Sequence, residues 1–216
     1  MRSPEDRATD YLSASMLRSL RYLALGVSLL LPGIYAAMAM FHQQMLPTKL
    51  LLSIVESKQD VPFSTLFEVV GLLCAFELLQ QAGLHLPQAI GTAVSIIGGL
   101  VVGTAAVDAK LVSPAALIVT ASSGICGFTL PNRELSDALR LWRLGLTVLG
   151  GVFGLFGVTA GLLLLLVRLA GLESLGRSYL APFGEAEVKG ALVRERLTEQ
   201  KWRDGTLRPL DERNQR

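Results

Sequence analysis

Charge is scarce through most of this chain, and that absence decides its class. Asp, Glu, Lys and Arg are all missing from four windows: Tyr22–Phe41, Leu86–Val107, Leu111–Asn132 and Leu144–Val167. Each window has about the 20 residues that an α-helix needs to cross a hydrocarbon core. Hydrophobic residues make up 51% of the 216 residues, which is typical of membrane proteins. We therefore predict an all-α fold, a polytopic integral membrane bundle in contact with membrane lipid.

The sequence also has little that would suit catalysis, metal binding or nucleic-acid binding. It lacks the HExxH and GxSxG motifs and a phosphate-binding loop, and neither His42 nor His85 stands at metal-ligand or triad spacing. Cys74 and Cys126 lie in apolar segments without CxxC spacing, which favours buried hydrophobes over a disulfide or metal site. The net charge of +2 comes without a basic patch interleaved with aromatics. We predict no enzyme, no catalytic or metal-binding residues, no cofactor and no nucleic-acid partner.

The polar ends of the chain set the predicted domain limits. Residues 1–21 form a polar segment that ends in Arg18 and Arg21, next to the first uncharged window. Because Lys and Arg are enriched at the cytoplasmic ends of membrane helices, this segment is predicted to be cytoplasmic. The membrane domain is predicted to cover residues 22–182, and residues 183–216 are predicted to form a polar C-terminal tail.

Two carboxylates stand inside an apolar helix predicted to run from Val61 to about Ala82. Glu68 and Glu77 are nine residues apart, which turns the helix by about 900° and places them on opposite sides. A charged group at the centre of a spanning helix costs roughly 2.5–3.5 kcal/mol. The helix is therefore predicted to be re-entrant or oblique, or to line a cavity, with Gln80 near its wet end. A pore-facing role is favoured for Glu68, whereas for Glu77 function and a structural bond to another helix weigh equally.

Three prolines are candidate hinges because each stands in or beside a predicted membrane helix. Pro32 interrupts the first window, where it removes one helical hydrogen bond, and a packing bend is favoured over a gating hinge. Pro62 suits the first turn of the helix that carries Glu68, with Asp60 as its cap. Pro114 stands at the start of the third window.

The second window carries a stripe of small residues and ends beside a third carboxylate. The stripe consists of Gly91, Ser95, Gly99 and Gly103, which recur every four residues on one face. Small residues let another helix approach closely, either within the chain or between chains. Asp108 follows in a short connection, where it is either a further polar site within the membrane or part of a solvated turn.

Four full crossings are predicted, with interfacial helices between them. The segments His42–Asp60 and Arg133–Arg143 mix apolar stripes with charges, which suits helices at the membrane surface. Four crossings put both arginine-rich ends in the cytoplasm but leave Arg133, Arg140 and Arg143 outside, against the positive-inside tendency. Five crossings would reverse this conflict.

Several of these strings, at their spacing, resemble a known family. They are HQQMLPTKLLLSI, VPFS followed by Glu68, the stretch AFELLQQAGLHLPQAIGTAVSIIGGLVVGTAAVDAKLVSP, and SLGRSYLAP. They resemble the membrane domain of GerA-type spore germination proteins, the A subunits of nutrient germinant receptors, from about Arg18 to Pro182. The resemblance implies the inner membrane of a bacterial endospore, B and C receptor subunits as partners, and an oligomeric, nutrient-gated channel that releases ions in germination. Glu68, Glu77 and Asp108 are in register with the family.

The sequence differs from the family pattern at several positions, and these differences favour considering other functions. Ser64, Leu72-Leu73, Gln80-Gln81 and Thr104 stand where the family carries Pro, Met-Glu, Arg-Glu and Gln, and Asp108 and Lys110 replace Glu and Gly. The family's large soluble domain is not within these 216 residues. The alternative function is a non-conducting scaffold or accessory subunit. A secondary transporter is disfavoured because the hydropathy shows no inverted repeat.

Overall fold

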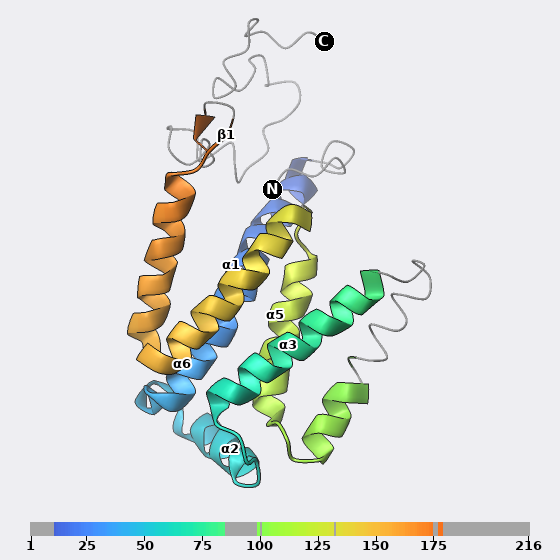
Figure 1. Ribbon diagram of the computed structural model, residues 1–216, viewed down its shortest axis with the longest axis vertical. Helices are drawn as coiled ribbons and strands as arrows, with labels where there is room; N and C mark the ends of the chain where they lie inside the picture. Colours follow the sequence, from blue (N-terminus) through green and yellow to red (C-terminus); the bar gives the residue numbers. More distant parts are fainter. Residues whose placement is uncertain (1–10, 85–98, 100, 132, 175–176, 179–216) are drawn as a thin grey trace, which may run out of the picture. The chain divides into compact units, whose positions relative to one another are not determined.

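The computed structural model describes residues 11–84, 99, 101–131, 133–174 and 177–178. The chain divides into two units, residues 24–162 and residues 1–23 together with 163–216. The larger unit contains all the candidate site residues except Gly91 and Ser95, which lie outside the described residues, as does the predicted tail 183–216. Figure 1 shows the helices that position these residues.

The described residues are almost entirely helical. The elements are α1 (Tyr11–Met40), the 3₁₀ helix η2 (Gln43–Met45), α2 (Thr48–Lys58), α3 (Thr65–Leu84), α5 (Pro114–Phe128) and α6 (Arg133–Ala170), and residues 101–108 are also helical. The exception is a pair of two-residue antiparallel strands, β1 (Glu173–Ser174) and β2 (Arg177–Ser178). Two helices are long and apolar enough to cross a membrane, α1 and the Leu135–Ala170 part of α6. The all-α class is confirmed, and the number of crossings stays a prediction.

Helix α1 continues through its proline. Pro32 is fully buried within the helix, which runs on to Met40. At Gly33 an added Cβ would lie 3.0 Å from the backbone oxygen of Leu146, so the absence of a side chain lets α6 pack closely here. The buried, closely packed surroundings of Pro32 suit a packing position, and its role as a hinge stays a prediction.

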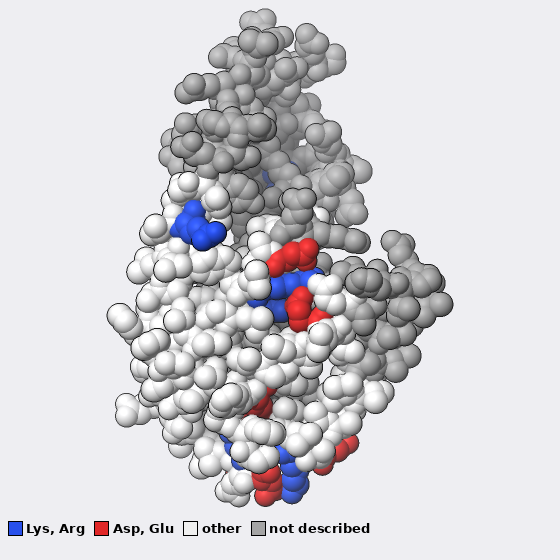
Figure 2. Space-filling model, in the orientation of Figure 1, with Lys and Arg blue, Asp and Glu red and all other residues white. Residues whose placement is uncertain are grey.

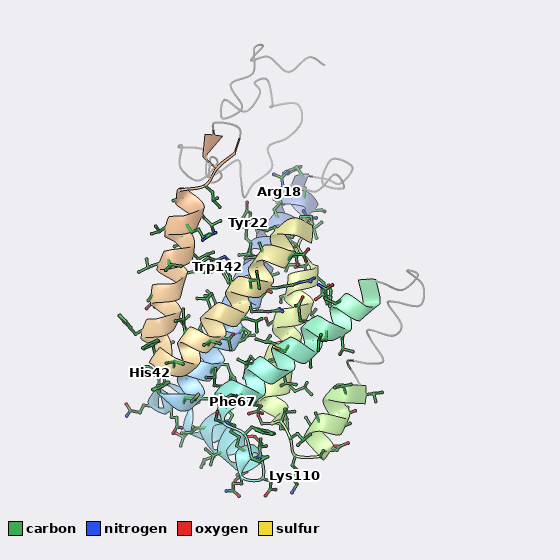
Figure 3. All side chains as sticks on the ribbon, viewed as in Figure 1. Arg18, Tyr22, His42, Phe67, Lys110 and Trp142 are labelled. Atoms are coloured by element: carbon green, nitrogen blue, oxygen red, sulfur yellow. The ribbon has the colours of Figure 1, made fainter. Side chains whose placement is uncertain are left out.

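The connection that follows α2 places Pro62 outside any helix. The structure begins α3 at Thr65, where the N–H of Glu68 donates to the carbonyl oxygen of Ser64 at 3.0 Å. The prediction that Pro62 occupies the first turn is therefore wrong, as is the assignment of Asp60 as its cap. Asp60 instead pairs with the ammonium of Lys110 at 2.6 Å, and both side chains are well exposed. Figure 3 shows Lys110 at the end of the unit where α2 lies.

Helices α3 and α5 pack against each other in parallel and form the centre of the larger unit. Their buried core is Val69, Leu72, Leu73 and Ala116, with Tyr35, Val112, Leu117 and Leu144 packed around it. Glu68 meets Ser113 at the first turns of the two helices, and Phe76 meets Gly124 further along both, which fixes the parallel direction. Figure 1 shows α3 inclined to α5, and the predicted oblique or re-entrant course of α3 in the membrane stays a prediction. Ser113 caps α5 by accepting from the N–H of Ala116 at 3.3 Å, and Pro114 follows at the helix start as predicted.

Helix α6 reverses direction at Gly154. This residue has φ 66° and ψ −152°, a region of backbone space that is essentially open only to glycine. The two arms then lie against each other, so that a Cβ on Gly157 would stand 2.1 Å from the carbonyl oxygen of Leu149. The prediction of a surface helix over Arg133–Arg143 followed by one span over Leu144–Val167 is therefore wrong. One helix runs from residue 133 to the reversal, and a second arm returns from it (Figure 1).

Two of the four small residues in the predicted stripe can be placed. A Cβ on Gly103 would lie 3.3 Å from Cδ1 of Leu117 on α5, so this position serves close packing within the chain. Among the described residues, no atom lies within 4 Å of a Cβ on Gly99. The packing role is thus seen at Gly103 alone.

Candidate functional site

The first candidate site surrounds Glu68, and we call Lys58, Thr65, Glu68 and Ser113 the Glu68 cluster. The Glu68 side chain is completely buried. Its Oε1 accepts the backbone N–H of Ser113, the capping residue of α5. Its Oε2 lies 3.5 Å from Nζ of Lys58, the last residue of α2, and Lys58 also donates to Oγ1 of Thr65. The cluster therefore ties together α2, α3 and the start of α5.

Helix ends supply much of the electrostatics in the Glu68 cluster. Glu68 stands in the first turn of α3, and Ser113 stands at the first turn of the parallel helix α5. The N-terminal ends of helices carry partial positive charge, so both helix dipoles stabilise the carboxylate. The positive groups around the carboxylate thus come from the backbone and from a single side chain, Lys58.

Two polar atoms near this cluster are enclosed without a hydrogen bond. Across the described residues, neither Oε2 of Glu68 nor the hydroxyl of Tyr35 has a hydrogen-bond partner. Tyr35 is on α1 and packs against the core formed by α3 and α5. A buried carboxylate oxygen that relies on one lysine at 3.5 Å is costly to keep charged if that lysine moves.

The second candidate site surrounds Glu77, and we call Glu77, Asp137, Arg140 and Arg143 the Glu77 cluster. Nη1 of Arg140 donates to Oε1 of Glu77 at 2.7 Å and lies 3.2 Å from Oδ1 of Asp137. Nη2 of Arg143 lies 3.6 Å from Oε2 of Glu77. The structure therefore gives Glu77 the bond to another helix that the sequence left open. On the face in Figure 2, acidic and basic side chains adjoin in a patch within an otherwise mostly uncharged surface.

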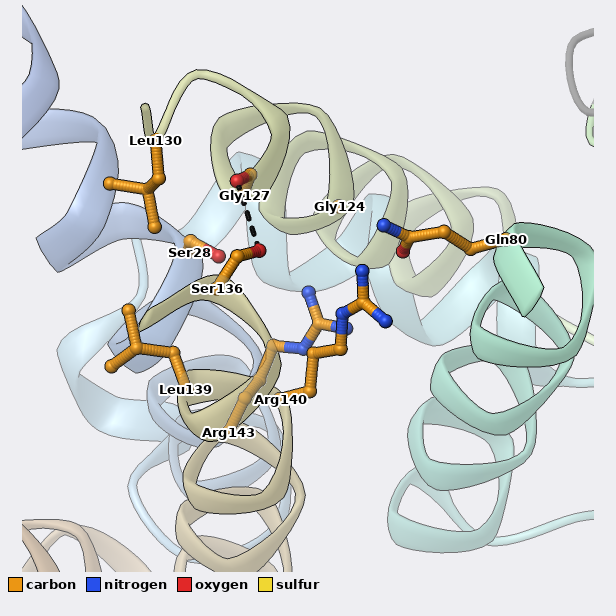
Figure 4. A pocket seen from close by; sticks show the side chains of 9 residues that line it. All are labelled: Ser28, Gln80, Gly124, Gly127, Leu130, Ser136, Leu139, Arg140 and Arg143. Carbon is orange, nitrogen blue, oxygen red and sulfur yellow. Dashed lines mark hydrogen bonds between the residues drawn. The ribbon is translucent and has the colours of Figure 1, made fainter. Parts of the chain in front are cut away.

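The Glu77 cluster continues inward to α1 and α5 through serine side chains. The hydroxyl of Ser123 on α5 donates to the carbonyl oxygen of Ser28 on α1 at 2.7 Å. Nη1 of Arg143 lies 3.5 Å from the same Ser123 oxygen. A small cavity beside these groups is lined by Gln80 and both arginines (Figure 4). The cluster thus joins α3 and α6 to the inner helices.

The remaining predicted polar candidate stands apart from both clusters. Asp108 is exposed near the end of the helix over residues 101–108. The structure brings Gln80 to the Glu77 cluster and leaves Glu68 at the other end of α3. Within the ranges that the structure describes, no three His, Cys, Asp or Glu side chains are grouped as a metal ion would need.

Comparison with known proteins decides the family. Residues 1–206 match the model of the Bacillus/Clostridium GerA spore germination protein, which covers most of the chain. The chain belongs to the GerA family. No solved structure gives a significant match.

Curated relatives of this GerA chain are longer than the chain itself. It is 40% identical over 197 residues to the uncharacterized membrane protein YfkQ of Bacillus subtilis, covering 90% of this chain and 38% of that protein. It is also 40% identical over 195 residues to spore germination protein KA of B. subtilis, covering 89% of this chain and 36% of that protein. With spore germination protein A1 of B. subtilis it shares 35% over 189 residues, covering 88% and 39%. The chain thus spans somewhat over a third of the length of these relatives.

The sequence did not point to the partners that the GerA chain gives its two carboxylates. Lys58 reads as one of several charges on a surface helix, and Ser113 contributes a backbone N–H that no side-chain pattern reveals. Arg140 and Arg143 are three apart and therefore share one helix face, a signal that both could meet one carboxylate. This spacing identifies the two arginines but not the carboxylate that they bind, because Glu77 is 63 residues from Arg140.

Proposed function

We propose that this chain is a membrane subunit of a spore germinant receptor and a component of an oligomeric, nutrient-gated ion channel that acts in germination. Membership of the GerA family supports the role in germination. The observation that carries the channel part is the contact of Lys58 with Glu68, a carboxylate inside an apolar helix whose neutralising cation comes from another helix. A carboxylate within a membrane helix is by default a functional-site hypothesis.

The contact supports a gating role for α2. Pro47 precedes α2 and Pro62 follows it, so both connections are restricted in backbone conformation. The Lys58 side chain is 21% exposed, whereas that of Glu68 is enclosed. A displacement of α2 would withdraw the ammonium group and leave the charge of Glu68 uncompensated. Rings of carboxylates from several subunits are a recognised way to select cations.

The proposed topology has four full crossings, with α3 as an oblique or re-entrant helix that does not complete a crossing. The proposed location is the inner membrane of a bacterial spore.

The proposed partners are further copies of this chain and the B and C subunits of the receptor. Exposed residues on α3 support a contact between subunits, because Phe67, Gly71, Cys74 and Leu78 fall on one side of that helix and outside the packed core. Single-cysteine variants test it: Cys74 should cross-link between subunits in membranes. Cys126, which is half-buried on α5, should not.

Cation efflux from liposomes that contain the purified chain tests the channel proposal. We expect Glu68→Gln to reduce efflux severalfold while the protein stays folded and oligomeric. Glu56→Gln on α2 is the matched control, because Glu56 is exposed and its loss removes the same charge. Absence of efflux from well-inserted, oligomeric protein would contradict the proposal.

A scaffold that holds partner subunits without conducting is the second candidate. It is favoured by the Glu77 cluster, where the carboxylate is bound to arginine inside the chain rather than left open to a cavity. A scaffold should be indifferent to Glu68→Gln in efflux and should retain its partners.

A further inference from the structure

The cavity beside the Glu77 cluster is lined by positive and neutral polar groups together with Leu130 and Leu139. Its volume is about 10 Å³, close to the space that one water-sized sphere needs. Arg140, Arg143, Gln80, Ser28 and Ser136 contribute the polar side chains of its wall. Gly124 and Gly127 of α5 contribute backbone alone on the opposite side. Figure 4 shows the two guanidinium groups side by side, pointing toward the space below α5 and toward Gln80.

The positive charges around this cavity are more buried than the carboxylates that pair with them. Two arginine side chains are 7% and 13% exposed, and the one carboxylate between them, Glu77, is 24% exposed. Asp137 is 62% exposed, so solvent screens most of its effect. Glu77 holds Arg140 at 2.7 Å but Arg143 only at 3.6 Å. Arg143 is therefore the more buried of the two arginines and has the longer contact with their shared carboxylate.

Arg143 also has hydrogen-bond donors to spare. Its Nε is buried with no partner anywhere in the described ranges, and its Nη1 reaches Ser123 only at 3.5 Å. A guanidinium group has five N–H donors and no acceptor. A buried charge with unfilled donors is costly unless an acceptor comes to it.

We propose that this cavity binds one small inorganic anion of the size of chloride, held between Arg140 and Arg143 with Gln80 and a serine hydroxyl as further donors. The anion adds a second counter-charge to that of Glu77, which contacts Arg143 only at 3.6 Å. The small volume favours a single monatomic ion over larger organic anions. This site is separate from the Glu68 cluster and does not depend on the proposed channel function.

Thermal unfolding of the purified full chain in detergent tests the anion site. Sodium chloride is compared with sodium gluconate at equal ionic strength, because gluconate is too large for the cavity. Tm should rise by roughly 2–4 °C once chloride exceeds its dissociation constant about fivefold. Equal Tm in both salts across the titration would overturn the proposal and would leave the cavity to a water molecule.

Two variants tie the response to this cavity. Arg143→Gln should abolish the dependence of Tm on chloride. Gln80→Glu places a carboxylate at the cavity wall, and this carboxylate supplies the counter-charge in place of chloride. Tm should therefore become independent of chloride although Arg143 is intact. The control Gln59→Glu makes the same change on the exposed end of α2 and should keep the wild-type response. A chloride response that persists unchanged in Gln80→Glu would also overturn the site.

Discussion

The ammonium group of Lys58 lies 3.5 Å from Oε2 of Glu68, and no other side chain cation is paired with that enclosed carboxylate in the described structure. The contact joins the end of α2 to the first turn of α3. Because the Glu68 side chain has no exposure to solvent, its charge depends on this lysine and on the N–H of Ser113. The position of α2 therefore sets how close the Lys58 ammonium group lies to Glu68.

Loss of Lys58 should destabilise the protein more than loss of the Glu68 charge. Lys58→Gln leaves a buried carboxylate unpaired, which is expected to cost about 3 kcal/mol. Glu68→Gln keeps an oxygen for the N–H of Ser113 and frees a lysine that can reach water, so we expect a loss of about 1 kcal/mol or less. Chemical unfolding in detergent measures both. Equal losses would show that the pair is not what holds the carboxylate.

The two carboxylates of the Glu77 cluster should contribute very differently to the free energy of unfolding. Glu77→Gln leaves two largely buried arginines without their main counter-charge, and the free energy of unfolding should fall by about 2–4 kcal/mol. Asp137→Asn removes an exposed partner of Arg140 and should cost about 1 kcal/mol at most. The same unfolding measurement compares them. A similar, small effect of both changes would contradict the buried pairing.

The reversal of α6 should depend on one glycine. Gly154→Ala forces a side chain into a backbone region at φ 66° and places its Cβ 2.9 Å from Cε1 of His42, whose position Figure 3 shows. We expect a loss of about 1–3 kcal/mol or more. Gly145→Ala is the matched control, because a Cβ there meets no atom within 4 Å, and the change should be neutral or stabilising by about 1 kcal/mol. Equal changes in the free energy of unfolding for both variants would show that a side chain at position 154 does not strain the reversal.

The class of the fold and the identity of the unusual residues were accessible from the sequence. Uncharged windows predict apolar helices because their length matches a bilayer, and carboxylates stand out because charge is otherwise absent there. Ser113-Pro114 was recognisable as a helix start, because serine caps and proline tolerates the first helical position.

The partners of the carboxylates could not be predicted, because they come from distant parts of the chain. Ser113 is 45 residues from Glu68, and Arg140 is 63 residues from Glu77. Sequence reasoning treated Arg140 and Arg143 as free charges outside the membrane, and this produced the conflict over four or five crossings. Since both are bound to Glu77 among the helices, they do not count as loop charges in the positive-inside tendency.

The prediction of one continuous span over Leu144–Val167 was wrong for a different physical reason. The uncharged run from Leu144 to Val167 is continuous, and hydropathy carries no signal for a reversal inside it. Six glycines stand in that run, and each could serve either packing or a turn. Only the packing of Leu149 against Gly157 and the backbone at Gly154 distinguish these uses.

Cation efflux from liposomes that carry Lys58→Gln, alone and combined with Glu68→Gln, tests the central claim most directly. If Lys58 neutralises a carboxylate that attracts cations, efflux should rise severalfold in Lys58→Gln and return to the low level of Glu68→Gln in the double variant. Circular dichroism confirms that each variant is folded. Unchanged efflux in Lys58→Gln, or a rise that persists in the double variant, would contradict the account.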